Sequence, residues 1–229
     1  MKTKMFAFAG LTAVLFSTAA TAQENIILGA DPVIDQPSAE TGFGWSAGIA
    51  ATARFSTSDD FDHAENEVEG FVELTYGNFH SGLTVTTLYQ DPADDVEFEA
   101  NLGYGMEFGQ GLSWDLTYGY LWLNNTSGHS EEITATFGFP IGQSTEAAVA
   151  VIFDPDTGKS DQEFAFETPL TDKWSLVGLV GNSDRDGNVY GELGAVYALS
   201  DEMSFQVLYE DTNDSGGLLG FTFAYEIGS

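Results

Sequence analysis

The sequence predicts an all-β protein, a single antiparallel up-and-down transmembrane β-barrel of about twelve strands. Three observations support this fold class. Apolar and polar residues alternate along many segments, which is the period of a strand with one apolar and one polar face. Several segments reach the roughly 9–11 tilted residues that cross a bilayer. Short turns and longer acidic loops follow the segments in strict alternation, as in a barrel whose ends face different compartments.

The clearest strand pair is the hairpin from Val96 to Leu123. Its first run ends at Phe108, its second begins at Leu112, and Gly109, Gln110 and Gly111 separate them. Aromatic residues lie near both ends of the apolar face, as in the girdles that meet the two membrane interfaces. The hairpin therefore predicts two membrane-crossing strands with lipid on one side and water on the other.

The chain before the first strand divides into two segments. Residues 1–22 are typical of a secretory signal: Lys2 and Lys4 precede an apolar stretch, and small residues lead to a cleavage point near Ala22. Residues 23–41 have no periodicity and contain Asp-Pro and Gln-Pro, which favours an N-terminal periplasmic arm. The barrel is expected to occupy residues 42–229.

The remaining strands are predicted in order from the same alternation. Gly77-Asn78 is a tight hairpin turn, whereas residues 58–66 are expected to form an acidic loop. Later pairs are joined by turns at Gly142–Ser144, Thr171–Lys173 and Ser200–Glu202. The expected strands are Phe43–Phe55, Glu67–Tyr76, Phe79–Tyr89, Glu132–Ile141, Thr145–Phe153, Gln162–Leu170, Trp174–Gly181, Asn188–Leu199, Met203–Tyr209 and Gly217–Ile227.

Composition limits the partners and the chemistry. The chain carries a formal net charge of −30, and loss of Lys2 and Lys4 with the signal makes it more negative, which excludes nucleic acid as a partner. There is no cysteine, so neither a disulfide framework nor a thiolate site is expected. No apolar run after the signal is long enough for a transmembrane helix, so contact with outer-membrane lipid requires a closed barrel.

Carboxylates are expected to line the barrel interior, where Arg54 is the only base predicted within a strand. Low-dielectric walls focus the field of such acids, so the sequence predicts a porin-like passive channel in the bacterial outer membrane, open to small cationic or neutral solutes. The selected lumen-lining acids are Glu69, Glu73, Glu97, Glu99, Asp115, Glu163, Glu167 and Glu192. Apolar residues that point inward from the last four strands predict a packed wall or an amphipathic groove: Val177, Leu179, Val196, Leu208 and Leu218.

Two alternatives remain open at this stage. One is a non-conducting structural or surface-binding barrel whose loops contact partners outside the cell. The other is a soluble periplasmic β-protein in which the apolar faces of two sheets pack together. Conductance separates the first alternative from a channel, and membrane fractionation separates the second.

Enzyme chemistry, cofactors and metals have little support in the sequence. The histidines His63 and His129 lie in expected loops and His80 lies beside a turn, so no serine or aspartate relay is predicted and the protein is expected not to be an enzyme. Glu97 and Glu99 share one strand face, which is typical of a wet wall rather than a glycosidase pair. Weak calcium candidates in the loops are Asp154, Asp156, Asp184, Asp186 and Asp211.

Residues 97–213 resemble a known family. The carrying motifs are Glu97-Phe98-Glu99 before Gly103-Tyr104, the run Leu116-Thr117-Tyr118-Gly119-Tyr120-Leu121, and Tyr209-Glu210-Asp211-Thr212. They are similar to the uncharacterised proteobacterial outer-membrane barrels named Gcw_chp. This resemblance implies a β-barrel in the outer membrane and implies no particular activity.

Overall fold

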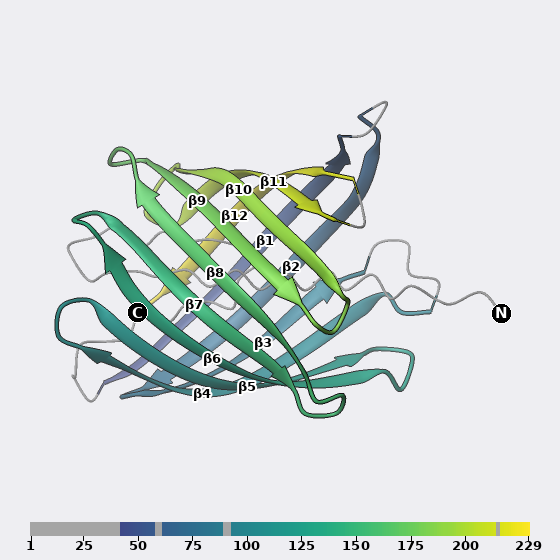
Figure 1. The fold of residues 1–229 in the computed structure, drawn as a ribbon, viewed down its shortest axis with the longest axis horizontal. Helices are drawn as coiled ribbons and strands as arrows, with labels where there is room; N and C mark the ends of the chain where they lie inside the picture. The colour runs from purple at the N-terminus through teal and green to yellow at the C-terminus, as the bar shows by residue number, and fades with distance from the viewer. Residues whose placement is uncertain (1–41, 58–60, 89–92, 214–215) are drawn as a thin grey trace.

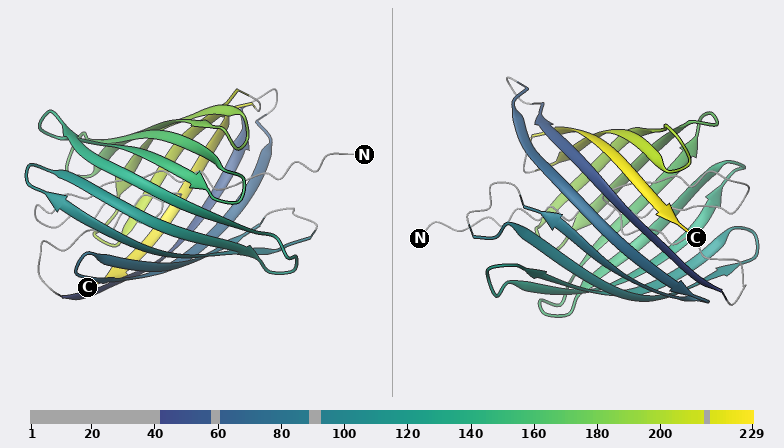
Figure 2. Two further views of the ribbon diagram at one scale, coloured as in Figure 1. Left: turned by 60° about the horizontal axis from the view of Figure 1, so that its bottom comes forward. Right: turned by 180° about the vertical axis from the view of Figure 1, so that it is seen from behind.

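The protein is a closed barrel of twelve strands, each antiparallel to its neighbours and hydrogen-bonded in chain order, with β1 pairing β12 to complete the ring (Figures 1 and 2). This computed structural model describes residues 42–57, 61–88, 93–213 and 216–229. The prediction of an all-β, up-and-down barrel is therefore confirmed. The expected signal and N-terminal arm lie outside the described residues. Among those residues, no helix is long and apolar enough to span a membrane.

Several strands are longer than the alternation predicted. β2 begins at His63 rather than Glu67, so the last four residues of the loop expected over residues 58–66 are strand, and β6 and β8 also start three residues early. Hydropathy alternation missed these ends because both of their faces are polar. The strands are β1 (Phe43–Ser56), β2 (His63–Tyr76), β3 (Phe79–Thr87), β4 (Val96–Phe108), β5 (Leu112–Leu123), β6 (His129–Ile141), β7 (Thr145–Asp154), β8 (Lys159–Pro169), β9 (Trp174–Ser183), β10 (Asn188–Ala198), β11 (Met203–Thr212) and β12 (Leu218–Gly228).

Tight turns connect the strands at one end of the barrel. Gly77 has a φ of 59°, and Gln110 and Gly111 have φ values of 76° and 74°. Two consecutive residues with positive φ match the right-handed twist of the flanking strands, which is why this turn type closes hairpins. The longest connections, between β1 and β2 and between β3 and β4, lie at the opposite end, whereas the loops after β7 and β9 are as short as some of the turns.

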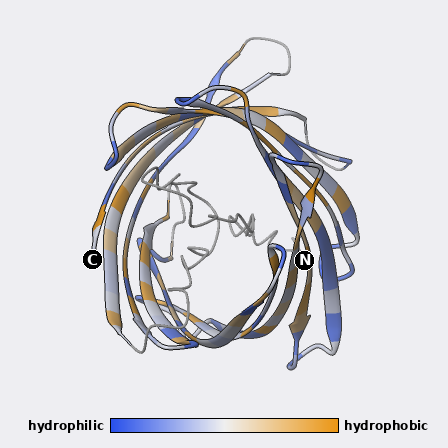
Figure 3. Ribbon diagram, turned by 90° about the vertical axis from the view of Figure 1, so that its left-hand side faces the viewer, coloured by the Kyte–Doolittle hydropathy of each residue, from blue (hydrophilic) through white to orange (hydrophobic). Residues whose placement is uncertain are grey.

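The apolar side chains lie on the outside of the barrel. Leu102 is 60% exposed, Val180 51% and Leu193 54%, while their neighbours along each strand are more buried. Viewed along the barrel, hydrophobic and hydrophilic residues alternate along the strands (Figure 3). Among the described residues no large side chain is fully buried, so the apolar faces of two sheets do not pack into a sandwich core. This arrangement removes the structural basis for the soluble β-protein alternative.

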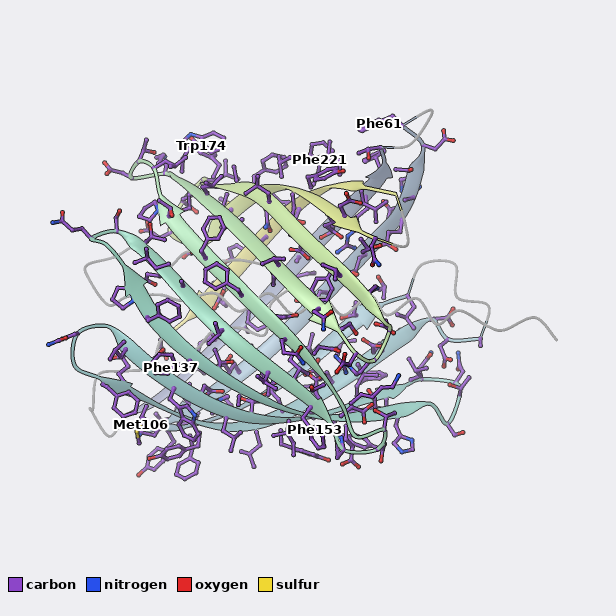
Figure 4. The ribbon with its side chains drawn as sticks, viewed as in Figure 1. Phe61, Met106, Phe137, Phe153, Trp174 and Phe221 are labelled. Atoms are coloured by element: carbon purple, nitrogen blue, oxygen red, sulfur yellow. The ribbon has the colours of Figure 1, made fainter. Side chains whose placement is uncertain are left out.

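Aromatic residues lie on the outer face near both ends of the barrel, and Trp174 and Phe221 project away from it (Figure 4). At the turn end, Trp174 packs against Tyr197 with ring centroids 4.7 Å apart. At the loop end, Phe98 stacks on Trp122 at 5.4 Å. Amphipathic rings favour the two interfaces of a bilayer, and these two pairs occupy positions where the girdles are expected.

Asp94 joins the β3–β4 and β5–β6 connections at the loop end of the barrel. Its Oδ1 accepts the backbone N–H groups of Asn125 at 2.8 Å and Thr126 at 2.9 Å, which ties the β3–β4 connection to the β5–β6 connection. Burial acts to raise the pKa of Asp94, but these hydrogen bonds outweigh it and hold the pKa below its usual value.

We expect Asp94→Asn to loosen this contact, because the amide cannot replace a charged acceptor of two N–H groups. Hydrogen exchange of the Asn125 and Thr126 amides should become faster, while Asp95→Asn, a change at the exposed neighbour, should leave it unchanged. Since the folded pKa is lowered, the contact contributes stability above the unfolded pKa and loses it as pH falls through the folded value. Equal exchange in both variants would contradict this role.

Candidate functional site

Strand alternation places all eight selected acids on the interior face. Glu73, Glu163 and Glu167 are 5%, 6% and 5% exposed, although the adjacent Leu74 is 44% exposed on the outer face. Glu97, Glu99 and Glu192 lie near the loop end of β4 and β10, whereas Asp115 lies in the first part of β5, near the turn end. The acids are therefore spread along the barrel axis rather than gathered at one level.

Near the loop end, inward charged side chains on β1, β2, β4, β6, β8, β10 and β11 lie within electrostatic range of one another. Arg54 contacts Glu67, which lies within electrostatic range of Glu97; Glu97 in turn acts on Glu132. Glu132 interacts with Asp161 on β8, and Glu163 on the same strand interacts with Glu192 on β10. Glu192 interacts with Glu210 on β11, which is paired with Arg54. We call this set the carboxylate ring: Glu65, Glu67, Glu97, Glu132, Asp161, Glu163, Glu192 and Glu210, with Arg54 and Arg185.

Arg54 neutralises one side of the ring. Its Nη1 donates to Glu65 Oε1 at 2.7 Å and to Glu67 Oε2 at 3.3 Å. Its Nε donates to Glu210 Oε1 at 3.1 Å, across the intervening strand β12. The inner position of β12 at this level is Gly220, and its lack of a side chain leaves room for the arginine to cross.

Arg185 neutralises the opposite side from the β9–β10 loop. Its Nε donates to Asp161 Oδ2 on β8, and its Nη1 lies 3.5 Å from Glu132 Oε2 on β6. The pKa of Arg185 is raised, because its hydrogen bond and attraction to Asp161 outweigh the effect of burial. β8 begins at Lys159, so Arg54 is not the only base within a strand; the Lys159 Nζ donates to the backbone oxygen of Arg185.

A buried hydrogen bond completes the ring between β8 and β10. Tyr190 is 6% exposed, and its hydroxyl donates to Glu163 Oε1 at 2.6 Å. The phenol lies over Gly181 of β9, the strand between β8 and β10. Gly181 is the register partner of Glu163 on one side and of Tyr190 on the other. The same cluster contains Leu179, one of the inward apolar residues, so this part of the wall is packed.

A second polar cluster lies inside the turn end. His80 Nε2 is 2.8 Å from Asp115 Oδ2 and 3.4 Å from Thr117 Oγ1, and the Thr117 hydroxyl donates to Asp115 Oδ1 at 2.6 Å. A catalytic relay needs the carboxylate and the hydroxyl on different imidazole nitrogens. Here both contact the same nitrogen, so the cluster does not have relay geometry.

The other sequence candidates are placed separately. The His129 Nδ1 donates to the backbone oxygen of Ser127 at 3.2 Å rather than meeting a serine hydroxyl. The Asp154 carboxylate closes its own turn by accepting from the backbone of Asp156 and Thr157. Asp184, Asp186 and Asp211 lie on or beside loops, and within the described ranges no three acid or histidine side chains are grouped to hold a metal.

Sequence reasoning missed three parts of the ring. Asp161 and Glu65 were assigned to loops because their strands continue past the apolar pattern, and Arg185 reaches the interior from a loop. Tyr190 carried a usable signal, since it shares the inward parity of Glu192 two residues later. Contacts between side chains on strands that are not adjacent in the barrel cannot be predicted from the alternation of residues along one strand.

Fold and interior together define a class, the closed twelve-stranded barrels with the fold of outer-membrane porins. The chain is similar to the KdgM porin, with a TM-score of 0.62, 8% identity, and coverage of 78% of this chain and 98% of that one. It is similar to the NanC porin, with a TM-score of 0.56, 6% identity, and coverage of 78% and 97%. Outer membrane phospholipase A from Escherichia coli is also similar, with a TM-score of 0.54, 11% identity, and coverage of 78% and 89%.

These similarities establish the fold alone. No protein-family model and no curated protein matches the chain, so the specific resemblance to Gcw_chp is not confirmed.

Proposed function

We propose that this protein lies in the bacterial outer membrane and is a porin-like channel with an acidic interior that prefers small cations and admits neutral solutes. The observation that carries the proposal is the carboxylate ring, in which acids outnumber arginines near the loop end of the interior face. A ring with an excess of one sign enriches ions of the opposite sign where low-dielectric walls focus its field. The apolar exterior and the aromatic residues near both ends of the barrel support the membrane location.

The solute class follows from the sign of the interior charge. One structure similar to this chain is the KdgM porin in complex with disordered oligogalacturonate, whose sugar units carry carboxylates. A carboxylate-lined interior repels such an anionic oligomer, so the proposed solutes differ from that one. A passive channel needs no cofactor, and the clusters at His80 and His129 lack relay geometry, which supports a function other than catalysis. Membership of the Gcw_chp family stays a prediction.

The test is conductance of the full, folded protein in a planar bilayer under a KCl gradient. We expect a reversal potential that indicates preference for potassium over chloride, reduced at high salt because the fixed charges are screened. Liposome swelling should admit a neutral monosaccharide and reject an oligouronate. Silent bilayers with protein whose gel migration is heat-modifiable would support the structural or surface-binding barrel instead, and a preference for chloride would contradict the proposal.

A further inference from the structure

The β9–β10 loop brings a positive charge into the interior of the barrel. The backbone N–H of Arg185 donates to Asp161 Oδ1 at 3.3 Å, and that of Asp184 donates to the backbone oxygen of Ser160 at 3.3 Å. The Lys159 Nζ holds the Arg185 carbonyl at 3.0 Å. These contacts come from the first residues of β8, so the loop is attached to the wall beside the carboxylate ring.

The guanidinium of Arg185 then crosses β7. It joins Asp161 on β8 to Glu132 on β6, and Asp154, the last residue of β7, also acts on it electrostatically. Asp161 is only 3% exposed. A carboxylate buried to that degree is costly without an ionic partner, so the arginine has a defined place rather than a range of positions.

The two arginines of the ring lie on opposite sides of the barrel. Arg54 belongs to β1, and the contacts of Arg185 lie on either side of β7, which is opposite β1 in the closed order of twelve strands. Glu97 on β4 and Glu192 on β10 occupy the two arcs between them. The charged groups acting on Glu97 are the carboxylates Glu67 and Glu132. On Glu192, Arg54 acts together with the carboxylates Glu210 and Glu163. Positive charge is therefore concentrated at two opposite positions of the ring.

We propose that Arg185 is a specificity-determining residue of the channel, a countercharge supplied by a loop that limits how strongly the carboxylate ring prefers cations. The inference rests on the proposed function and adds the residue that sets the degree of selectivity. Because two arginines balance the eight acids of the ring, loss of one makes the net charge of the ring more negative. Asp161 and Glu132, which Arg185 contacts, then act on passing ions without their countercharge.

The test compares two variants that lose the same charge in different places. Arg185→Gln removes the charge from the ring, whereas Lys173→Gln removes it from the turn end, where the Lys173 Nζ lies 5.8 Å from the centre of the Tyr197 ring. A unit charge about 8 Å from an ion in water-like surroundings changes its local concentration about twofold, in opposite directions for cations and anions. We therefore expect Arg185→Gln to raise the potassium-to-chloride permeability ratio about fourfold and Lys173→Gln to leave it unchanged.

Two further variants separate charge from structure. Arg185→Lys keeps the charge and should retain a ratio close to that of the wild type. Glu132→Gln removes a negative charge from the same contact and should lower the ratio, which gives a second reading if Arg185→Gln fails to fold. A conducting wild type with equal ratios in Arg185→Gln and Lys173→Gln would overturn the role of Arg185 alone. A folded wild type that never conducts would overturn the proposed function, and this inference with it.

Discussion

Reversal of two carboxylates, in the variant Glu97→Lys with Glu99→Lys, is expected to lower the potassium-to-chloride permeability ratio about tenfold or more. Both residues are on the interior face of β4 near the loop end. Carboxylates act on Glu97 from both sides, and Glu99 faces Glu132 across Gly119, where an added Cβ would lie 3.3 Å from Glu99 Oε1 and 3.2 Å from Glu132 Cγ. The reversal therefore converts an acidic arc of the carboxylate ring into a basic one.

The matched control is Asp201→Lys with Glu202→Lys. This pair makes the same change of net charge in the exposed turn between β10 and β11, outside the barrel interior. Its permeability ratio should equal that of the wild type when the reversal potential is measured under the same KCl gradient. If both double variants lower the ratio equally, selectivity depends on the net charge of the protein and not on the ring.

The second large effect concerns stability. Gly181→Ala is expected to destabilise the barrel by about 1–3 kcal/mol, the usual cost of forcing extra volume into a packed site. An added Cβ would overlap the phenol ring of Tyr190, which lies over Gly181 and donates to Glu163 at 2.6 Å. The ring cannot move aside without losing this buried hydrogen bond, so the midpoint of urea unfolding in detergent should fall.

Gly191→Ala is the control for this measurement. An added Cβ there meets only the backbone oxygen of Leu179 at 3.5 Å, an ordinary contact distance. Tyr190→Phe provides the complementary variant, because it removes the hydroxyl without adding volume. Gly181→Ala should lower the unfolding midpoint more than Gly191→Ala, and equal midpoints would refute the packing role of Gly181.

The fold was predictable because a barrel with an apolar exterior repeats one simple local rule. In the hairpin from Val96 to Leu123, every second side chain lies on the apolar outer face, so the period of two is visible in the sequence. The rule stops at the loop end, where His63 and Lys159 belong to strands whose two faces are both polar. These strand ends were predicted as loops for that reason.

The interior site was predictable only as a set of inward positions. Alternation placed Glu97, Glu163 and Glu192 on one face, but it carried no information about which groups meet across the barrel. The contact of Arg54 with Glu210 joins residues 156 positions apart, and that of Arg185 with Glu132 joins residues 53 apart. Gly181 and Gly220 have no side chain and so leave room for the Tyr190 phenol and the Arg54 guanidinium, respectively. A hydropathy pattern contains no information about this space.

By itself the sequence determined the strand count, the closed antiparallel order, the apolar exterior and the side of each strand that carries acids, because each of these follows from alternation and turn chemistry along the chain. Only the tertiary structure decided that the acids near the loops form a ring, that two arginines lie at opposite positions of it, and that one arginine comes from a loop. The physical reason is closure: strands distant in the chain become neighbours only when β1 pairs with β12, and the interior contacts depend on that curvature and on the register of every pair between them.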